Sequence, residues 1–316
     1  MLSYPEAIVI GALQGITELF PVSSLGHSVL IPALVGGSWA QDLDVSTPES
    51  PYLAFIVGLH VATAAALLLF FWRDWLRIVG GLFSVIRHRR IRSDNERLAA
   101  LIVLATIPVG VFGLVLEHLF RTTLGRPIPA AAFLLANGVV LLVGERLRRR
   151  ATASVREYAS VGVGSVRSDP VTDPDEGLDE AQANVRSDAR LARLRLGAGL
   201  AIGSAQVLAL LPGISRSGVT MVAGLLGGLS HRDAARFSFL LATPVILAAG
   251  ALKIPDLFGP LGAGIGGQIL AGSVASFVCA YLAVRFLERY FRRNTLTPFA
   301  IYCMIAGAGA LIWLSV

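Results

Sequence analysis

Long uninterrupted apolar runs constrain the fold of this chain more than any other feature. Residues 52–72, YLAFIVGLHVATAAALLLFFW, contain one histidine and no other ionisable group apart from a tyrosine. About 20 such residues in a helix cross the roughly 30 Å hydrocarbon core of a bilayer. Hydrophobic residues make up 54% of the 316 residues and charged residues 15%. Because the runs are continuous and not alternating, the sequence predicts an all-α polytopic membrane protein.

The basic residues indicate how the predicted spans are oriented. Cytoplasmic loops of membrane proteins carry an excess of arginine and lysine, and most of the 27 basic residues here crowd into alternate loops. The net charge of +6 therefore reports orientation, and no nucleic-acid partner is expected. We expect about six transmembrane helices, at residues 52–72, 98–118, 130–145, 237–254, 262–284 and 297–316.

Two further apolar segments, residues 4–34 and 196–229, are interrupted by prolines and glycines. Broken backbone at membrane depth is tolerated where it lines a cavity, so we predict two re-entrant helical hairpins. Each hairpin precedes three spans, which predicts two inverted repeats over residues 1–150 and 196–316. Residues 151–195 are polar and lack apolar periodicity, which predicts a largely disordered cytoplasmic linker. A surface helix starting within residues 186–195 is the alternative for its last part.

The first broken segment contains the sequence QGITELFPVSSLGH, which carries several polar groups. Gln14 and Glu18 are four residues apart and share a helix face. The proline then ends that half-helix, and Ser23 or Ser24 fits the N-cap of the next one, beside free backbone N–H groups. His27 falls in the first turn, on the face of Ser24. A serine beside a histidine and a carboxylate is the minimum for nucleophilic catalysis.

The second broken segment contains PGISRSGVT, with Arg216 at membrane depth. Ser215 or Ser217 can cap the half-helix that follows the proline and glycine. Arginine binds phosphate bidentately through its planar guanidinium. The two half-helix N-termini and Arg216 together predict one phosphate site shared by the two halves.

Structural interpretations compete with this one. A single serine in a membrane helix usually bonds back to a carbonyl, and Glu18 with Arg216 could form a buried ion pair without any reaction. His60, within the span 52–72, is interpreted as structural. Polar groups at membrane depth are costly and mark functional sites, so a glutamate, two serines and a histidine within ten residues favour a reactive site.

The two motifs resemble the signatures of the undecaprenyl-diphosphate phosphatases, the bacitracin-resistance membrane family. The first is similar to (E/Q)-x-x-x-E followed by PVSS-x-GH, and the second to PG-x-SRS-x-x-T. The segment GLLGGLSHRDAARFSFLLATPVIL also resembles the family, so the resemblance covers the whole membrane part.

The resemblance implies an enzyme that hydrolyses undecaprenyl diphosphate to undecaprenyl phosphate and inorganic phosphate, which recycles the cell-wall carrier lipid and confers bacitracin resistance. It also implies a polyprenyl diphosphate substrate, a divalent cation (Mg²⁺ or Ca²⁺), and a multi-pass location in the bacterial cell membrane. The active site would open to the outer face, and a homodimer is left open. The implied catalytic residues are Glu18, Ser24, His27 and Arg216, the implied substrate-binding residues are Ser23, Ser215, Ser217 and Thr220, and the implied metal ligands are Glu18 and Gln14. Gln14 stands where a second carboxylate is found in other members, which weakens a two-carboxylate metal site.

In the expected mechanism Ser24 attacks the terminal phosphorus, His27 is general base and then acid, and Glu18 orients His27 or holds the metal. The competing assignment makes His27 the nucleophile and Ser24 a phosphate ligand. A transporter or flippase for a phosphorylated lipid or anion is the alternative function. An intramembrane serine hydrolase is a weaker one, because it leaves Arg216 unexplained and lacks a Gly-x-Ser-x-Gly elbow.

Overall fold

The computed structural model describes the chain except residues 1, 44–50, 120–122, 161–174, 176 and 260–263. In the described residues all regular structure is helical. Five helices are long and apolar enough to cross a membrane, and α4 (Pro51–Phe70) adds a sixth where it joins α5 (Trp72–His88) at an 89° bend. The prediction of an all-α polytopic membrane protein is therefore confirmed. The five are α6 (Asp94–Leu119), α7 (Pro127–Ser160), α11 (His231–Phe258), α12 (Gly266–Tyr290) and α13 (Thr297–Ser315).

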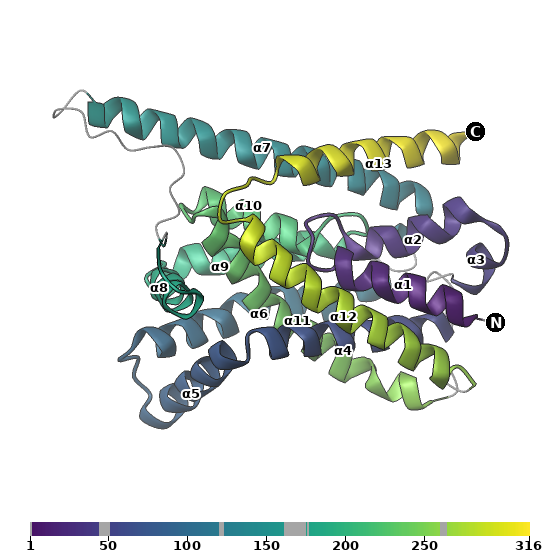
Figure 1. The fold of residues 1–316 in the computed structure, drawn as a ribbon, viewed down its shortest axis with the longest axis horizontal. Helices are drawn as coiled ribbons and strands as arrows, with labels where there is room; N and C mark the ends of the chain where they lie inside the picture. The colour runs from purple at the N-terminus through teal and green to yellow at the C-terminus, as the bar shows by residue number, and fades with distance from the viewer. Residues whose placement is uncertain (1, 44–50, 120–122, 161–174, 176, 260–263) are drawn as a thin grey trace.

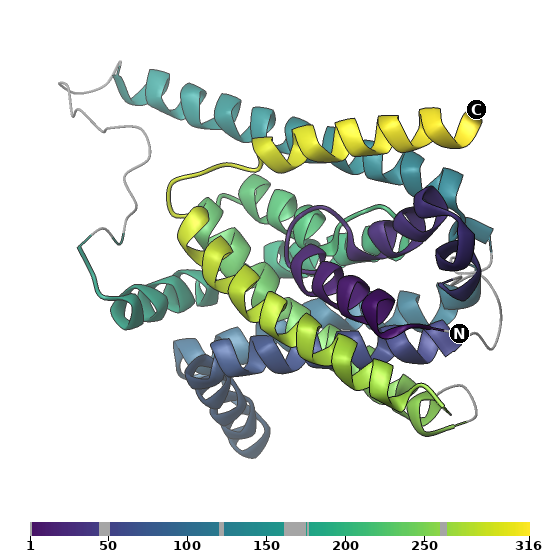
Figure 2. The ribbon, with the colours of Figure 1, turned by 45° about the vertical axis from the view of Figure 1, so that its right-hand side comes forward.

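Both interrupted apolar segments form pairs of short helices. The first consists of α1 (Tyr4–Thr17) and α2 (Ser24–Val35), followed by the short α3 (Gly37–Asp42). The second consists of α9 (Leu196–Ala205), the 3₁₀ helix η2 (Gln206–Leu210) and α10 (Arg216–Leu226). Figures 1 and 2 show α1 and α2 toward the end that carries both termini, and α9 and α10 toward the opposite end. The repeat relation between the two halves stays a prediction.

Small residues bring α1 against α12, which runs beside it in Figure 1. A Cβ on Gly11 would lie 2.2 Å from the carbonyl oxygen of Gly272, and one on Gly15 would lie 2.3 Å from that of Ser276. Glycines spaced four apart let two membrane helices approach this closely. The seam fixes the end of α1, from which Glu18 continues.

The helices α7 and α13 pack side by side along the top of the molecule in both views. Glycines again allow the approach, since a Cβ on Gly307 would lie 2.5 Å from the backbone nitrogen of Leu135. This pair places Asn137 of α7 and Tyr302 of α13 beside the broken segments, where both make hydrogen bonds described below.

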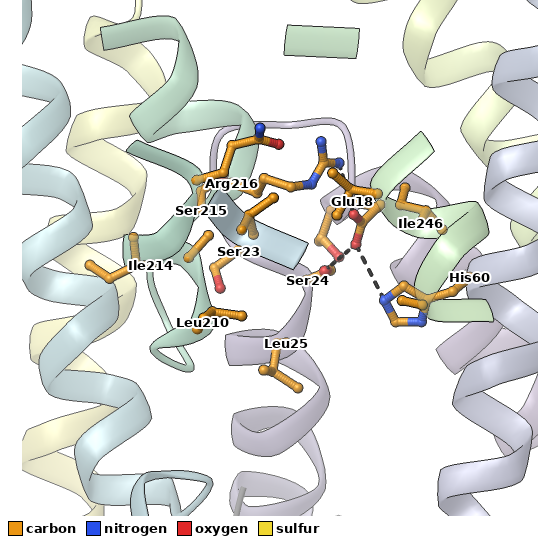
Figure 3. A pocket seen from close by; sticks show the side chains of 16 residues that line it. Glu18, Ser23, Ser24, Leu25, His60, Leu210, Ile214, Ser215, Arg216 and Ile246 are labelled. Atoms are coloured by element: carbon orange, nitrogen blue, oxygen red, sulfur yellow. Dashed lines mark hydrogen bonds and ion pairs between the residues drawn. The ribbon is translucent and has the colours of Figure 1, made fainter. Parts of the chain in front are cut away.

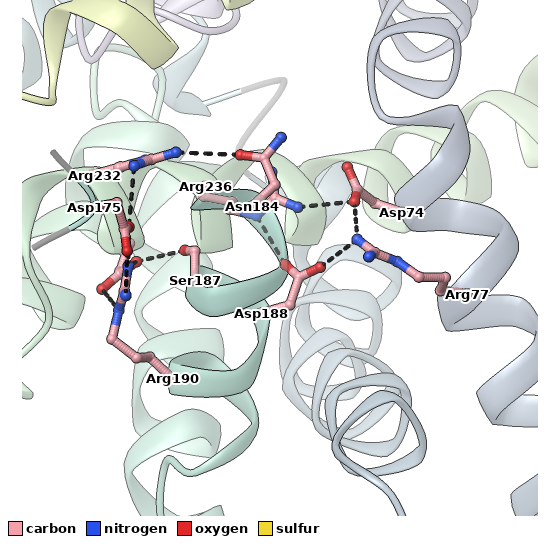
Figure 4. A network of polar contacts seen from close by, with 10 residues as sticks. Asp74, Arg77, Asp175, Asn184, Ser187, Asp188, Arg190, Arg232 and Arg236 are labelled. Carbon is pink, nitrogen blue, oxygen red and sulfur yellow. Dashed lines mark hydrogen bonds and ion pairs between the residues drawn. The ribbon is translucent and has the colours of Figure 1, made fainter. Parts of the chain in front are cut away.

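The polar stretch between the halves is more ordered than we expect from the sequence. α7 continues to Ser160, and residues 180–192 form α8 (Glu180–Ala192), whereas residues 161–174 and 176 lie outside the described part of the chain. Asp188 of α8 accepts hydrogen bonds from Arg236 Nε at 2.8 Å and Arg77 Nη2 at 2.9 Å (Figure 4). A surface helix is the alternative prediction for this part, but α8 begins earlier, at Glu180, and charge pairs with distant helices hold it.

Candidate active site

The turn between α1 and α2 is shaped by Ser23. Its φ of +70° is unusual for a residue with a side chain, and such strained positions cluster at functional sites. Its Oγ accepts a hydrogen bond from the backbone N–H of Gly26 at 3.2 Å, so Ser23 is the N-cap of α2. The hydroxyl of Ser24 is therefore not used for capping and is available to the pocket.

The turn before α10 is built in a similar way. The N-cap is Ser215, whose Oγ accepts from the N–H of Gly218 at 3.1 Å. Gly213 has a φ of +110°, and a Cβ there would lie 2.4 Å from the carbonyl oxygen of Ala130. A Cβ on Gly26 would lie 2.9 Å from the Cα of Gly213, so the two turns are in direct contact.

Asn137 of α7 joins these two turns. Its Nδ2 donates to the carbonyl of Pro21 at 3.1 Å, and its Oδ1 accepts from the N–H of Ser215 at 3.0 Å. The hydroxyl of Ser217 adds a third link by donating to the carbonyl of Phe20 at 3.0 Å. Asn137 is fully buried, so these bonds are protected from competing water.

A pocket lies where the broken segments meet (Figure 3), with about 700 Å³ of empty space when its opening to solvent is included. Its wall is apolar along α11 and the later part of η2 and polar around the end of α1 and the start of α10. A narrow polar patch inside an apolar cavity suits a ligand with a charged head and a hydrocarbon tail. The polar lining residues are Thr17, Glu18, Ser23, Ser24, His60, Gln206, Ser215 and Arg216.

Glu18 is the centre of the polar patch. Its Oε1 accepts a hydrogen bond from Arg216 Nη2 at 3.0 Å. Its Oε2 accepts from Ser24 Oγ at 2.5 Å and from Gln14 Nε2 at 3.1 Å. The ion pair with Arg216 exists, as the structural interpretation expects, but it lines a cavity and also engages a serine hydroxyl.

Arg216 has unused hydrogen-bonding capacity inside the pocket. Its side chain is 11% exposed, and its Nη1 is buried without a hydrogen-bond partner among the described residues. A buried guanidinium N–H left without a partner is costly unless a ligand satisfies it. An anionic group bound in the pocket would supply the acceptor.

His27 is turned away from this patch. Its Nδ1 lies 2.7 Å from the carbonyl oxygen of Ser23, and its Nε2 lies 2.7 Å from the hydroxyl of Tyr302, on which its ring stacks. Because a carbonyl only accepts, Nδ1 carries the proton and Nε2 accepts from Tyr302. The structure therefore brings Glu18, Ser24 and Arg216 together and leaves His27 outside the lining residues.

Ser217 and Thr220, two other residues predicted to bind the substrate, use their hydroxyls for hydrogen bonds to backbone carbonyls. Ser217 donates to Phe20, and Thr220 Oγ1 donates to the carbonyl of Arg216 at 2.7 Å. Neither lines the pocket, whereas Ser23 and Ser215 do. The hydroxyls of Ser217 and Thr220 hold α10 and the neighbouring turn in place, which positions Arg216.

Three residues of the site are not predicted from the sequence. His60 and Gln206 line the pocket, and Asn137 links its two turns. Each is a polar group in an otherwise apolar segment, and such residues mark functional sites by default. That signal was present for all three.

The residues around Glu18 fit a divalent cation only if a ligand contributes to its coordination. In the described part of the chain no group of three or more histidine, cysteine, aspartate or glutamate side chains could hold a metal. Mg²⁺ usually takes one or two carboxylates and completes its coordination with water and substrate phosphates. Glu18 and the amide of Gln14, 3.1 Å apart, suit such a shared site.

The fold and the pocket define a polytopic membrane protein whose two broken helical segments meet at a cavity lined by an arginine, a glutamate and several serines. The chain belongs to the family of bacitracin resistance protein BacA, whose model matches residues 7–309. It is 68% identical to the undecaprenyl-diphosphatase of Mycolicibacterium paratuberculosis over 314 residues, which are 99% of this chain and 98% of that protein. It is 53% identical to undecaprenyl-diphosphatase 1 of Frankia casuarinae, covering 97% and 96% of the two chains. The undecaprenyl-diphosphatase of Granulibacter bethesdensis is 42% identical, covering 98% and 96%.

Proposed function

We propose that this protein hydrolyses undecaprenyl diphosphate to undecaprenyl phosphate and inorganic phosphate. The observation that carries this proposal is the buried Arg216 Nη1, which needs an acceptor and lies in the same pocket as Ser24 and Glu18. The names of its relatives support the substrate. In this role the protein recycles the cell-wall carrier lipid and confers bacitracin resistance.

The nucleophile is Ser24. Its Oγ attacks the terminal phosphorus, the bond from that phosphorus to the bridging oxygen breaks, and undecaprenyl phosphate leaves with the bridging oxygen. The proton of Ser24 moves to Glu18 Oε2, a choice that the 2.5 Å hydrogen bond supports over His27. Glu18 passes this proton to the departing phosphate and is a carboxylate again. Water then attacks the phosphorus of the phosphoserine and gives a proton to Glu18, which returns it to Ser24 Oγ as the bond from Oγ to phosphorus breaks and inorganic phosphate leaves.

Arg216 stabilises the charge on the transferring phosphoryl group through Nη1, while Nη2 stays bonded to Glu18. Ser23 and Ser215, the caps of α2 and α10, orient the half-helix N-termini whose backbone N–H groups favour an anion. His27, held between the Ser23 carbonyl and Tyr302, positions the turn that presents Ser24.

A divalent cation, Mg²⁺ or Ca²⁺, is part of the proposal. Glu18 and Gln14 would hold it together with the diphosphate oxygens. It would neutralise part of the diphosphate charge next to Arg216. The protein lies in the bacterial cell membrane, and the pocket opens to the outer face.

The test measures phosphate release from a prenyl diphosphate by the purified protein in detergent. The wild type releases phosphate, Arg216→Ala and Ser24→Ala lose it, and Ser315→Ala, at an exposed site near the C-terminus, retains it. Phosphoserine trapped at Ser24 identifies the nucleophile. Lipid translocation in vesicles without phosphate release in detergent would instead favour the flippase. Full activity of Ser24→Ala would exclude Ser24 as the nucleophile.

A further inference from the structure

His60 of α4 reaches the pocket from the span that precedes α5. Its side chain is 30% exposed, and its Nε2 lies 3.7 Å from Glu18 Oε2 and 3.2 Å from Gln14 Nε2. The proposed mechanism gives this residue no role. It stands beside both residues that would hold the divalent cation.

The other ring nitrogen of His60 is already fixed. Nδ1 lies 2.9 Å from the carbonyl oxygen of Ile56, and a carbonyl can only accept, so Nδ1 carries the proton. Nε2 therefore presents its lone pair toward Gln14 and Glu18. Histidine ligands of metals almost always have this arrangement, in which one nitrogen donates to a carbonyl or carboxylate and the other faces the metal.

We propose that His60 Nε2 is a ligand of the divalent cation, together with the amide oxygen of Gln14 and Glu18 Oε2, which offers one lone pair to the ion and keeps the other for the Ser24 hydroxyl. This inference rests on the proposed function, because the substrate phosphates complete the coordination. Ligand atoms about 2.0–2.2 Å from one ion lie roughly 3–3.5 Å apart, so the 3.7 Å separation needs only a small side-chain shift. The oxygen and nitrogen of a side-chain amide are interchangeable by a flip, which would turn the Gln14 oxygen to the ion.

The charges around the site agree with this assignment. Glu18 is the single carboxylate that lines the described pocket, and Arg216 occupies its Oε1. A neutral imidazole adds a nitrogen ligand to the metal without adding charge. Three protein ligands leave coordination positions for water and phosphate oxygens. Imidazole nitrogen suits first-row ions such as Zn²⁺ best. Mn²⁺ stands at the weak end of that series and also takes oxygen ligands, whereas oxygen ligands bind the hard ion Ca²⁺. Mn²⁺ is therefore an ion that both the oxygen ligands and the imidazole can bind, and because it is paramagnetic it serves as the probe of this site.

The test uses the full-length protein in detergent with Mn²⁺ and methylenediphosphonate, a diphosphate that cannot be hydrolysed. Electron spin-echo spectroscopy of the bound Mn²⁺ should show coupling to a histidine nitrogen. His60→Ala should lose that coupling and weaken Mn²⁺ binding about tenfold or more, the scale seen when metal-site residues are removed, while Ca²⁺ binding changes less than Mn²⁺ binding. His88→Ala, a histidine exposed on α5, is the matched control and should behave as the wild type.

His60→Gln is the second variant, in which a side-chain amide replaces the imidazole. Thermal unfolding shows whether each variant is folded. The proposal is overturned if the wild type shows no nitrogen coupling or binds no Mn²⁺, or if folded His60→Ala and His60→Gln keep the coupling. Phosphate release measured in parallel separates the two claims. Nitrogen coupling without any phosphate release by the wild type would contradict the proposed function and leave His60 as a ligand.

Discussion

At the scale of single residues, one carboxylate organises the site. Glu18 receives hydrogen bonds from Ser24, Gln14 and Arg216, and the arginine comes from 198 residues further along the chain. Two short motifs therefore become one site through one side chain. Asn137 then holds together the two turns that carry these groups.

Glu18→Gln should lower kcat for phosphate release by about 100-fold or more, because general-base catalysis contributes on that scale and an amide does not take the Ser24 proton. Steady-state kinetics with a prenyl diphosphate in detergent measures this. Glu6→Gln, in the capping box of α1 and not among the residues that line the pocket, is the control. A kcat of Glu18→Gln within threefold of the wild type would contradict the role of Glu18 as base.

Asn137→Leu should destabilise the protein, because the Ser215 N–H and the Pro21 carbonyl both lose their partner. A buried group left unsatisfied costs about 1–3 kcal/mol, so a clear fall in Tm in detergent is expected, with lower activity. Asn294→Leu, at an exposed position after α12, should leave Tm close to that of the wild type. An unchanged Tm for Asn137→Leu would show that the two turns do not depend on this link.

At the scale of elements, the broken segments are held by close backbone contacts and by charge pairs. Gly11 and Gly15 seat α1 on α12. α8 is held differently, since it packs through Asp188 against arginines of α5 and α11. Burial raises the pKa of Asp188, whereas the neighbouring Arg236 lowers it.

Gly15→Val should destabilise the fold, because the new Cβ would lie 2.3 Å from the carbonyl oxygen of Ser276 and the backbones must separate. Overpacking of this kind costs about 1–3 kcal/mol. The readout is thermal unfolding in detergent. Gly110→Ala is the control, since a Cβ there meets no described heavy atom within 4 Å. Equal Tm values for the two variants would rule out the α1–α12 seam as a source of stability.

Asp188→Ala should release α8, because it leaves the fully buried Arg236 without one of its two carboxylate partners, Asp188 and Asp74. Removing one partner of a buried ion pair costs about 3–5 kcal/mol. Hydrogen exchange of residues 180–192 should become faster, whereas Gln182→Ala, exposed on α8, should not change it. Unaltered exchange in Asp188→Ala would mean that other contacts hold the helix.

At the scale of the whole molecule, arginines and the pocket set the proposed orientation. In the proposed orientation the arginine-rich turns between predicted spans are cytoplasmic, as the positive-inside rule expects, and α1 starts at the end of the molecule that carries both termini. If the arginine-rich turns are cytoplasmic, the end of the molecule that carries both termini and the start of α1 is the outer one, and the pocket is proposed to open there.

Leu25→Cys, at a partly exposed residue that lines the pocket, should react with a membrane-impermeant thiol reagent in intact cells. The experiment uses a Cys279→Ala background so that this partly exposed cysteine does not react, and Cys303 can stay because it is buried. Asn294→Cys, after α12 near Arg292 and Arg293, should react only after the membrane is permeabilised. The reverse pattern would place the pocket opening on the cytoplasmic face.

The sequence by itself determined the membrane class, the presence of two broken apolar segments, and the grouping of Glu18, Ser24 and Arg216. These follow from the cost of polar groups in lipid and from local helix signals, which act within a few residues. Only the tertiary structure decided that His27 turns to Tyr302 while His60 reaches Glu18, that Asn137 joins the two turns, and that α8 docks. The reason is physical: each depends on which side chains meet across distant helices, and the spacing of residues along one helix does not specify its neighbours.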